Sequence, residues 1–238
     1  MIRLYVDQPL APEQTVSLVR DQAHYLFSVM RLTPGTRLAL INGRDGEFDA
    51  VVDAAGKREG RLRVGERLRP LQRPPDLWLL FAPIKKARTD FIVEKAAELG
   101  AARILPVQTR FTNSERVRRE RLQAHVIEAV EQCGGTFVPE VAEMAKLDTM
   151  LSAWPADRNL IFCDETTAGE AQPLGLQPAP SAILIGPEGG FSEEERRRLR
   201  AMPQTQTITL GPRVLRADTA AVAALTLWQS RLGDWGFA

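Results

Sequence analysis

The stretch AILIGPEGGFSEEE, residues 182–195, decides the fold of the second half of this chain. Its apolar residues predict a strand that runs into Gly186-Pro187-Glu188-Gly189-Gly190, after which Ser192 and Glu195 form a capping box that opens a helix. Adjacent glycines let backbone groups approach a ligand at the carboxyl end of a strand, where α/β proteins bind ligands. A tight turn in left-handed backbone explains the same glycines, so their spacing alone leaves both interpretations open.

A second glycine-bearing loop lies in ITLGPRVLRADTAAVAAL, residues 208–225. A strand is predicted to end at Leu210-Gly211, and a helix begins at Asp218 or the next residue; close helix packing explains the alanines that follow. Arg213 and Arg216 lie in the loop between them, where an arginine among apolar residues usually has an anionic partner or ligand. Because parallel strands end at the same edge of a sheet, both glycine-bearing loops can line one cleft.

The rest of the sequence divides near residue 73. Residues 1–73 contain short strands joined by Pro-Gly, Asn-Gly and Asp-Gly turns, with one helix over 20–30, and predict a small antiparallel barrel. Residues 74–238 alternate apolar strands with amphipathic helices and predict an α/β domain whose parallel sheet is covered on both faces. The expected elements are strands at 77–82, 103–108, 160–163, 182–186 and 207–210 and a helix over 90–99.

Composition excludes several classes of protein. A chain of 238 residues that is 44% hydrophobic can bury a core, and its net charge of +1 argues neither for nor against a polyanionic partner. No run of ~18 apolar residues and no basic start before an apolar block occurs, so we expect no membrane span, no secretion signal and a cytoplasmic location. Two cysteines and two well-separated histidines predict neither a disulfide scaffold nor a metal site.

At this point the residues carry a resemblance to a known family. LIGPEGGFSEEE (184–195) and LGPRVLRADTA (210–220) resemble the two C-terminal motifs of the RsmE-type ribosomal RNA methyltransferases, which make 3-methyluridine in small-subunit ribosomal RNA. Further matches follow in the same order over nearly the whole chain: Met1 to Val6, His24 to Arg31, Gly35, Lys85-Lys86, Glu94 to Gly100, Glu128 to Gln132, and Pro139.

The resemblance implies a fold that the sequence pattern does not predict. It implies a PUA-like N-terminal β-barrel over 1–73 and, over 74–238, an α/β SPOUT domain whose C-terminal chain threads a trefoil knot. Since knots are nearly absent from proteins, the pattern alone predicts an open doubly wound sheet. The resemblance also implies S-adenosyl-L-methionine as cofactor, 16S ribosomal RNA of the small subunit as partner, and a homodimer. That dimer would bury Leu225, Leu227 and Trp228, which packing within one chain explains equally well.

The resemblance further implies that both glycine-bearing loops bind the cofactor, through Ile185, Gly186, Pro187, Glu188, Gly189, Gly190, Leu210, Gly211, Val214, Leu215 and Arg216. Uracil N3 carries a proton at neutral pH, so the enzyme must remove that proton or stabilise the anion that its loss creates. We predict a catalytic role for Arg216 as the stabiliser of this anion. Glu188 is the alternative proton acceptor, although a helix cap or a dimer contact explains it equally well.

For RNA binding, the resemblance points to Arg3, His24, Arg31, Lys85 and Arg88. Surface ion pairs, a helix cap or a solvated loop explain the same residues. Two departures from the family pattern stand out. First, no arginine follows Glu131-Gln132, where typical members carry one that is expected to contact RNA; Arg110 or Arg116 can substitute for it. Second, Asp218 stands in the last motif where glutamate is more common.

Two rival functions remain open at the level of sequence. The chain can be a ribosomal RNA-binding assembly factor that has lost its cofactor site, or a methyltransferase that acts on a different RNA position. The intact glycine-bearing loops favour catalysis over the first rival. They do not reveal the acceptor atom, so they leave the second rival open.

Overall fold

The computed structural model describes residues 1–56, 58–114, 117–169 and 180–235, and the chain folds into two compact units. Unit 1 comprises Met1–Arg73 and Val130–Val138, and unit 2 comprises Pro74–Ala129 and Pro139–Ala238. None of the described helices is long and apolar enough to cross a membrane. The described residues also hold no group of three or more His, Cys, Asp or Glu side chains placed to bind a metal ion.

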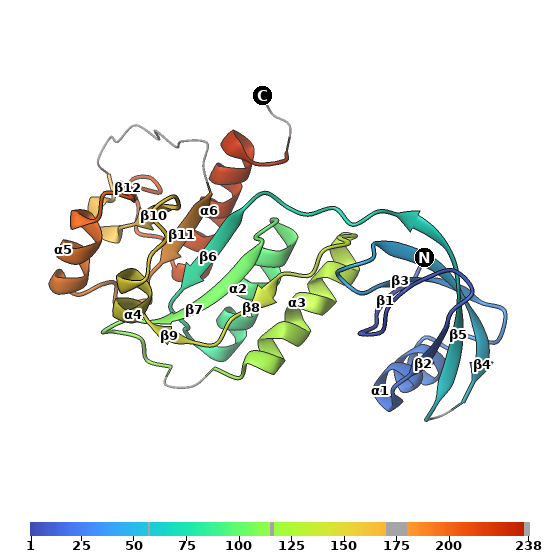
Figure 1. Ribbon diagram of the computed structural model, residues 1–238. Helices are drawn as coiled ribbons and strands as arrows, with labels where there is room; N and C mark the ends of the chain where they lie inside the picture. Colours follow the sequence, from blue (N-terminus) through green and yellow to red (C-terminus); the bar gives the residue numbers. More distant parts are fainter. Residues whose placement is uncertain (57, 115–116, 170–179, 236–238) are drawn as a thin grey trace. The chain divides into compact units, whose positions relative to one another are not determined.

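Unit 1 is built on a five-stranded sheet, drawn in blue to cyan in Figure 1. The strand order is β1-β3-β4-β5-β2, with β1 parallel to β3 and the other pairs antiparallel. Burial alternates along β2 and the first half of β5, whereas β3 beyond Arg37 and the first half of β4 are buried continuously; Val16, Leu38 and Leu62 are fully buried in the core. The strands are β1 (Arg3–Tyr5), β2 (Thr15–Leu18), β3 (Arg37–Ile41), β4 (Glu47–Ala55) and β5 (Gly60–Arg69).

The helical segment of unit 1 differs from the single helix predicted over 20–30. A short α1 (Arg20–Ala23) passes directly into a π-helix, η1 (His24–Val29), in which the Met30 amide donates to the Tyr25 carbonyl at 2.9 Å. Leu26 lies fully buried in the core of the unit. A π-helical turn of this kind is rare, and the apolar spacing of 20–30 does not distinguish it from an α-helical turn.

Unit 2 contains a seven-stranded sheet whose pairings are all parallel, which confirms the α/β prediction. Its order is β12-β10-β11-β6-β7-β8, and the short β9 also pairs with β7. The central strands are apolar and buried on both faces, as expected for a sheet with helices on each side. The strands are β6 (Leu77–Phe81), β7 (Arg103–Gln108), β8 (Glu140–Val141), β9 (Ala145–Lys146), β10 (Asn159–Cys163), β11 (Ser181–Ile185) and β12 (Thr205–Ile208).

The helices of unit 2 begin near the predicted places, with three differences. The helix predicted to open at a capping box of Thr112 and Glu115 begins only at Arg119, and Glu115 lies outside the described residues. Helix α2 starts four residues before Asp90, with Lys85 as its N-cap residue, and Asp90 instead accepts from Arg121 of α3 at 2.6 Å. Helix α6 starts at Ala217, just before the predicted Asp218, and packs against α2 and β11 (Figure 1). The helices of unit 2 are α2 (Lys86–Glu98), α3 (Arg119–Cys133), whose last four residues belong to unit 1, α4 (Leu147–Ser152), α5 (Glu193–Ala201) and α6 (Ala217–Leu232).

The order of strands β12-β10-β11 determines where a ligand can bind. The chain passes from β11 through α5 to β12 on the far side of β10, so three parallel strands end side by side. Ligands of α/β sheets bind at such carboxyl ends where the strand order changes direction. The trefoil knot that the resemblance implies stays a prediction.

Candidate active site

A cleft opens at the carboxyl ends of β10, β11 and β12. It consists of two adjoining hollows of about 50 and 220 Å³, the first walled mainly by the loop after β12 and the second by the loop after β11. The segment after β10 contributes to both. The two hollows share one wall, made by Cys163, Glu165, Val214, Leu215 and Ala220.

Most of the predicted cofactor-binding residues line this cleft. Those in the loop after β11 line the larger hollow, except Gly189, where an added Cβ would lie 3.1 Å from the Cβ of Phe111. The loop after β12 lines both hollows. The predicted residues found in the lining are Ile185, Gly186, Pro187, Glu188, Gly190, Leu210, Gly211, Val214, Leu215 and Arg216.

Sequence reasoning missed the third wall of the cleft. Cys163 ends β10, Asp164 and Glu165 follow it, and all three residues line the cleft, although none of them is a predicted site residue. The available signal was the position of Asp164 and Glu165 directly after a predicted apolar strand of a parallel sheet. Burial raises the pKa of the Cys163 thiol to about 12, so this side chain stays protonated and acts as part of the apolar wall.

The loop after β11 satisfies both interpretations of its glycines. Gly190 has φ +67 and its amide donates to the Pro187 carbonyl at 2.9 Å, which closes the tight turn. The same residue lines the larger hollow. A Cβ on Gly190 would also lie 3.1 Å from Nη2 of Arg196 and would overlap the Glu165 carboxylate, so the position needs glycine for its backbone and for its neighbours.

The predicted capping box of α5 is confirmed. The Glu195 amide donates to Ser192 Oγ at 3.3 Å, and the Ser192 amide donates to Glu195 Oε2 at 2.8 Å. The other oxygen of Glu195 accepts from the Arg110 amide at 2.8 Å, which ties the loop after β7 to the same helix start. The end of the glycine-bearing loop is therefore fixed at two places.

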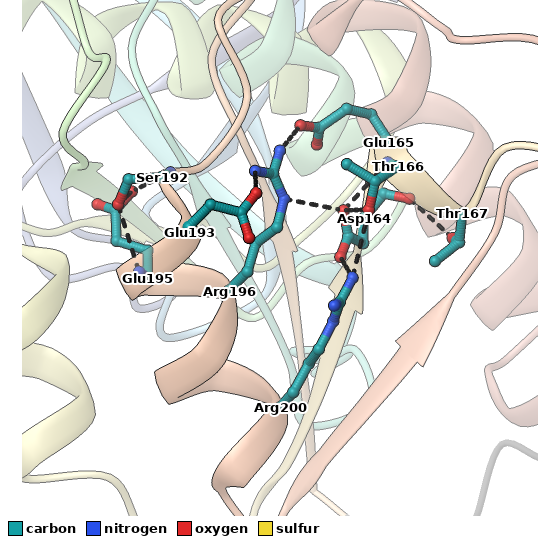
Figure 2. A network of polar contacts seen from close by, with 9 residues as sticks. All are labelled: Asp164, Glu165, Thr166, Thr167, Ser192, Glu193, Glu195, Arg196 and Arg200. Carbon is teal, nitrogen blue, oxygen red and sulfur yellow. Dashed lines mark hydrogen bonds and ion pairs between the residues drawn. The ribbon is translucent and has the colours of Figure 1, made fainter.

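A network of arginines and carboxylates connects α5 to the end of β10 (Figure 2). The Asp164 side chain is fully buried and accepts from Arg200 at 2.6 Å, from Arg196 at 3.4 Å and from the hydroxyl of Thr166 at 2.8 Å. Arg196 also donates to Glu165, and to Glu193 at 3.2 Å. Burial by itself raises the pKa of Asp164, but the hydrogen bonds from Thr166 and the Arg200 guanidinium outweigh it and lower that pKa below its usual value.

At the larger hollow the structure brings together two residues that were predicted for different roles. Arg88 Nη1 lies 3.8 Å from Glu188 Oε1, and Arg88 Nε lies 3.6 Å from Asp218 Oδ2. Arg216 lines the same hollow as Glu188, and its backbone forms the N-cap of α6. The larger hollow is therefore lined by the Glu188 carboxylate and the Arg216 guanidinium, and Arg88 lies beside Glu188; all three residues are partly or fully exposed.

Arg3, predicted to bind RNA, has a structural role in unit 1. Its side chain is 11% exposed and pairs with Glu47 at 2.8 Å, and Glu47 in turn pairs with Arg69. Arg3 also donates to the carbonyls of Val130 at 2.7 Å and Gly135 at 2.5 Å, so it satisfies orphan carbonyls at the end of α3. We therefore leave Arg3 out of the proposed RNA-binding surface.

Replacing Arg3 by methionine is expected to lower the free energy of unfolding by about 1–3 kcal/mol, because buried carbonyls and Glu47 lose a donor. Urea unfolding measures this loss. The matched control is Arg37→Met, which removes a guanidinium that pairs with Asp49 but is 68% exposed, and it should cost less than about 1 kcal/mol. Unchanged stability with weakened RNA binding would restore Arg3 to the RNA surface.

The other predicted RNA-binding residues are accessible. His24 on η1 and Arg31 after it are exposed in unit 1, and Arg31 adopts a left-handed φ of +58, which is uncommon outside glycine. Lys85 is exposed at the start of α2 in unit 2. Of the residues offered as substitutes for the missing arginine, Arg110 is exposed and Arg116 lies outside the described residues.

The residues predicted for a dimer interface are mostly buried inside one chain. Leu225 is fully buried and Trp228 is 4% exposed, so packing within the chain accounts for both. Leu227 is half-buried. These residues therefore give no support to the homodimer, which stays a prediction.

Two RNA methyltransferase families match different parts of the chain. The family described as RNA methyltransferase domain matches residues 72–229, and the one described as RNA methyltransferase PUA domain matches residues 19–65. The chain is 34% identical over 229 residues to ribosomal RNA small subunit methyltransferase E of Rickettsia conorii, covering 94% of this chain and 93% of that protein. It is 26% identical to the protein of the same name from Bacillus subtilis, covering 92% and 91%.

Two solved structures share the fold over almost their whole length. A ribosomal RNA small subunit methyltransferase E from Neisseria gonorrhoeae bound to S-adenosyl methionine has a TM-score of 0.89 at 27% identity and covers 99% of each chain. A methyltransferase from Legionella pneumophila in complex with the same cofactor has a TM-score of 0.85 at 30% identity and covers 98% of each chain. This chain therefore belongs to the RsmE-type family of ribosomal RNA methyltransferases.

Proposed function

We propose that the chain transfers a methyl group from S-adenosyl-L-methionine to N3 of a specific uridine in the 16S ribosomal RNA of the small subunit. One observation carries the proposal: the glycine-bearing loops after β11 and β12 line one cleft at the carboxyl edge of the sheet. The named relatives and the cofactor-bound Neisseria structure support it. A ribosomal substrate also implies a cytoplasmic location.

The chemistry of the cleft fits this cofactor. The smaller hollow is walled mostly by apolar side chains, including Ile208, Leu210 and Leu215, which suit a flat purine ring. Gly211 has φ +106 and no atom within 4 Å of a Cβ built on it, so this position leaves open space beside the backbone for a ligand. The carboxylates of Glu165 and Glu188 suit the hydroxyl and ammonium donors of the same molecule.

When bound, the cofactor supplies an electrophilic methyl group on a positively charged sulfur. The chain's contribution is positional, because transfer needs the acceptor nitrogen, the methyl carbon and the sulfur nearly in line. The loops at Gly186–Gly190 and Leu210–Arg216 hold the donor. The capping box and the arginine network of α5 keep the first of these loops in place.

The part of the larger hollow around Glu188 and Arg216 suits a uracil ring. Glu188 can accept the N3 proton, and Arg88 and Arg216 can offset the negative charge that its departure leaves on the two ring carbonyls. The separations of 3.8 and 3.6 Å around Arg88 are long for ion pairs, as is common before a substrate tightens a catalytic site. Arg216 keeps the role of anion stabiliser, and Arg88 adds a second cation beside Glu188.

We further propose a division of labour between the two parts of the chain. Residues 1–73 form the RNA-binding barrel, with His24 and Arg31 among its contacts, and residues 74–238 form the methyl-transferring domain, with Lys85 and Arg88 near its substrate. Two copies assemble as a homodimer. Binding of the RNA to these residues supplies the free energy, roughly a few kcal/mol, that extrusion of a stacked or paired base requires.

Transfer of labelled methyl groups to small-subunit particles that lack the modification tests the function, with nucleotide mapping of the product. We expect label at N3 of one uridine. Glu188→Gln should slow single-turnover transfer at saturating cofactor by about 10²-fold or more, since it removes the proton acceptor while keeping shape. The matched control is Glu194→Gln on α5, an exposed carboxylate away from the cleft, which should leave the rate unchanged.

Each contrary outcome identifies a different error. Calorimetry that shows no heat with S-adenosylmethionine would indicate the assembly factor. Label on a ribose or on another base would overturn the uridine N3 assignment while keeping the cofactor site. A Glu188→Gln variant with the wild-type rate would exclude Glu188 as the proton acceptor.

A further inference from the structure

Glu165 occupies a position in the cleft that no predicted role explains. It opens the short 3-10 helix η2 (Glu165–Thr167) that follows β10, and its side chain is 32% exposed. It is the carboxylate that lines both hollows: Asp164 lines only the smaller and Glu188 only the larger. Glu165 therefore lies at the junction between the two halves of the site.

The arginine network holds this carboxylate in a fixed orientation (Figure 2). Glu165 Oε1 accepts from Nη2 of Arg196, whose own side chain is 11% exposed. Asp164 and Glu193 bind the remaining nitrogens of that guanidinium. Gly190 packs under the pair so closely that a Cβ there would lie 2.8 Å from Glu165 Cδ. A carboxylate gripped in this way loses little rotational freedom when it binds a ligand.

The second oxygen of Glu165 remains available. Within the described part of the chain, Oε2 has no hydrogen-bond partner, whereas both oxygens of Asp164 accept from arginine. A carboxylate oxygen accepts hydrogen bonds only, so the complementary ligand group is a donor. Paired hydroxyls of a ribose are such donors, and carboxylates bind them in other nucleotide sites at the carboxyl edge of parallel sheets.

The layout of the cleft selects the ribose among the donors of S-adenosylmethionine. The smaller, apolar hollow suits the adenine, and the larger one contains Glu188 and Arg216, where the methyl group meets its acceptor. The ribose is the part of the molecule that joins these two ends. Glu165 stands on the wall that joins the two hollows.

We infer that Glu165 binds the ribose hydroxyls of S-adenosylmethionine and that Arg196 is the residue that positions its carboxylate. The inference rests on the cofactor site of the proposed function and adds the residue that recognises the sugar. It does not depend on which RNA atom receives the methyl group. Its test therefore uses binding and needs no RNA.

The experiment measures dissociation constants by calorimetry for S-adenosylmethionine, for S-adenosylhomocysteine, and for 2′-deoxy and 3′-deoxy forms of the latter. In the wild-type chain we expect loss of a hydroxyl to weaken binding about 10- to 100-fold, as for a hydrogen bond to a charged group. In Glu165→Ala the same loss should change affinity less than about 3-fold, because the acceptor is already gone.

The proposed role of Arg196, to position the Glu165 carboxylate, is tested with the same ligands. Arg196→Lys cannot reproduce the planar fork that grips Glu165, so it should shrink the deoxy effect to an intermediate value. The matched control is Arg197→Met, the next residue on α5, which is exposed and does not line the cleft. That variant should keep the full deoxy effect. Thermal melting without ligand verifies that each variant is folded.

The outcomes separate this inference from the function on which it rests. A full deoxy effect in folded Glu165→Ala would place the sugar contact elsewhere. If Glu165→Ala weakened binding of S-adenosylmethionine but not of S-adenosylhomocysteine, Glu165 would interact with the positively charged sulfur instead. That result would overturn the ribose assignment. A wild-type chain that binds none of these ligands would remove the cofactor site itself and this inference with it.

Discussion

Replacing Gly190 by valine should abolish detectable binding of S-adenosylmethionine and lower the free energy of unfolding by about 2–5 kcal/mol. The backbone at φ +67 costs a side chain roughly 1–2 kcal/mol, and a β-branched one fits there least well. The new side chain would also overlap the Glu165–Arg196 pair, and such overpacking costs about 1–3 kcal/mol. Calorimetry and urea unfolding measure the two effects.

The control for this substitution is Gly35→Val in unit 1. Gly35 has φ +88, and no atom lies within 4 Å of a Cβ built there, so it shares the backbone strain without the overlap. We expect a loss of about 1–2 kcal/mol with unchanged cofactor affinity. Equal cofactor affinity in both variants would show that the packing around Gly190 does not shape the site.

Replacing Asp164 by asparagine is expected to lower the free energy of unfolding by about 3–5 kcal/mol, since it leaves Arg196 and Arg200 without their buried counter-charge. Cofactor binding should weaken with it, because Asp164 holds the arginine that orients Glu165. The matched control is Asp148→Asn. Asp148 pairs with Arg198, which lies on α5 like Arg196 and Arg200, but the Asp148 side chain is 75% exposed. The substitution should cost less than about 1 kcal/mol.

The effect of Asp164 also depends on pH. Its pKa is lower in the folded chain than the value of about 3.9 expected when unfolded. Its stabilisation is therefore complete above that unfolded value and is lost as the pH falls through the folded pKa. The stability difference between wild type and Asp164→Asn should be constant near neutral pH and shrink below about pH 4. A difference that grows on acidification would contradict this account.

Local chemistry made part of this molecule predictable. Ser192 and Glu195 cap α5 with groups three residues apart, so the sequence contains the whole interaction. The loops after β11 and β12 were identified because apolar strands end in glycines. The parallel arrangement then brings them together without knowledge of any single contact.

Contacts between residues far apart in the sequence could not be predicted. Glu165 and Arg196 are 31 residues apart in the sequence and form an ion pair. Their contact accompanies a strand order in which β12 pairs with β10 and not with β11, which the sequence does not reveal. Arg3 reaches the carbonyl of Val130 across 127 residues, and nothing near Arg3 in the sequence indicates that its charge is used inside the protein. The π-helical turn at His24–Val29 was likewise not predicted, because its apolar spacing fits an α-helix as well.

Unit 1 is made of two separate segments of the chain, which affects how the protein can be recombined or engineered. Because Val130–Val138 belongs to the unit with Met1–Arg73, the N-terminal module is discontinuous in the gene. A fragment cut after Arg73 would lack the carbonyl of Gly134 that Arg69 binds at 2.8 Å and the hydroxyl of Thr136 that binds the Gln72 amide at 2.8 Å. Recombination that exchanges this module between relatives must therefore carry two separate segments together to preserve a complete fold.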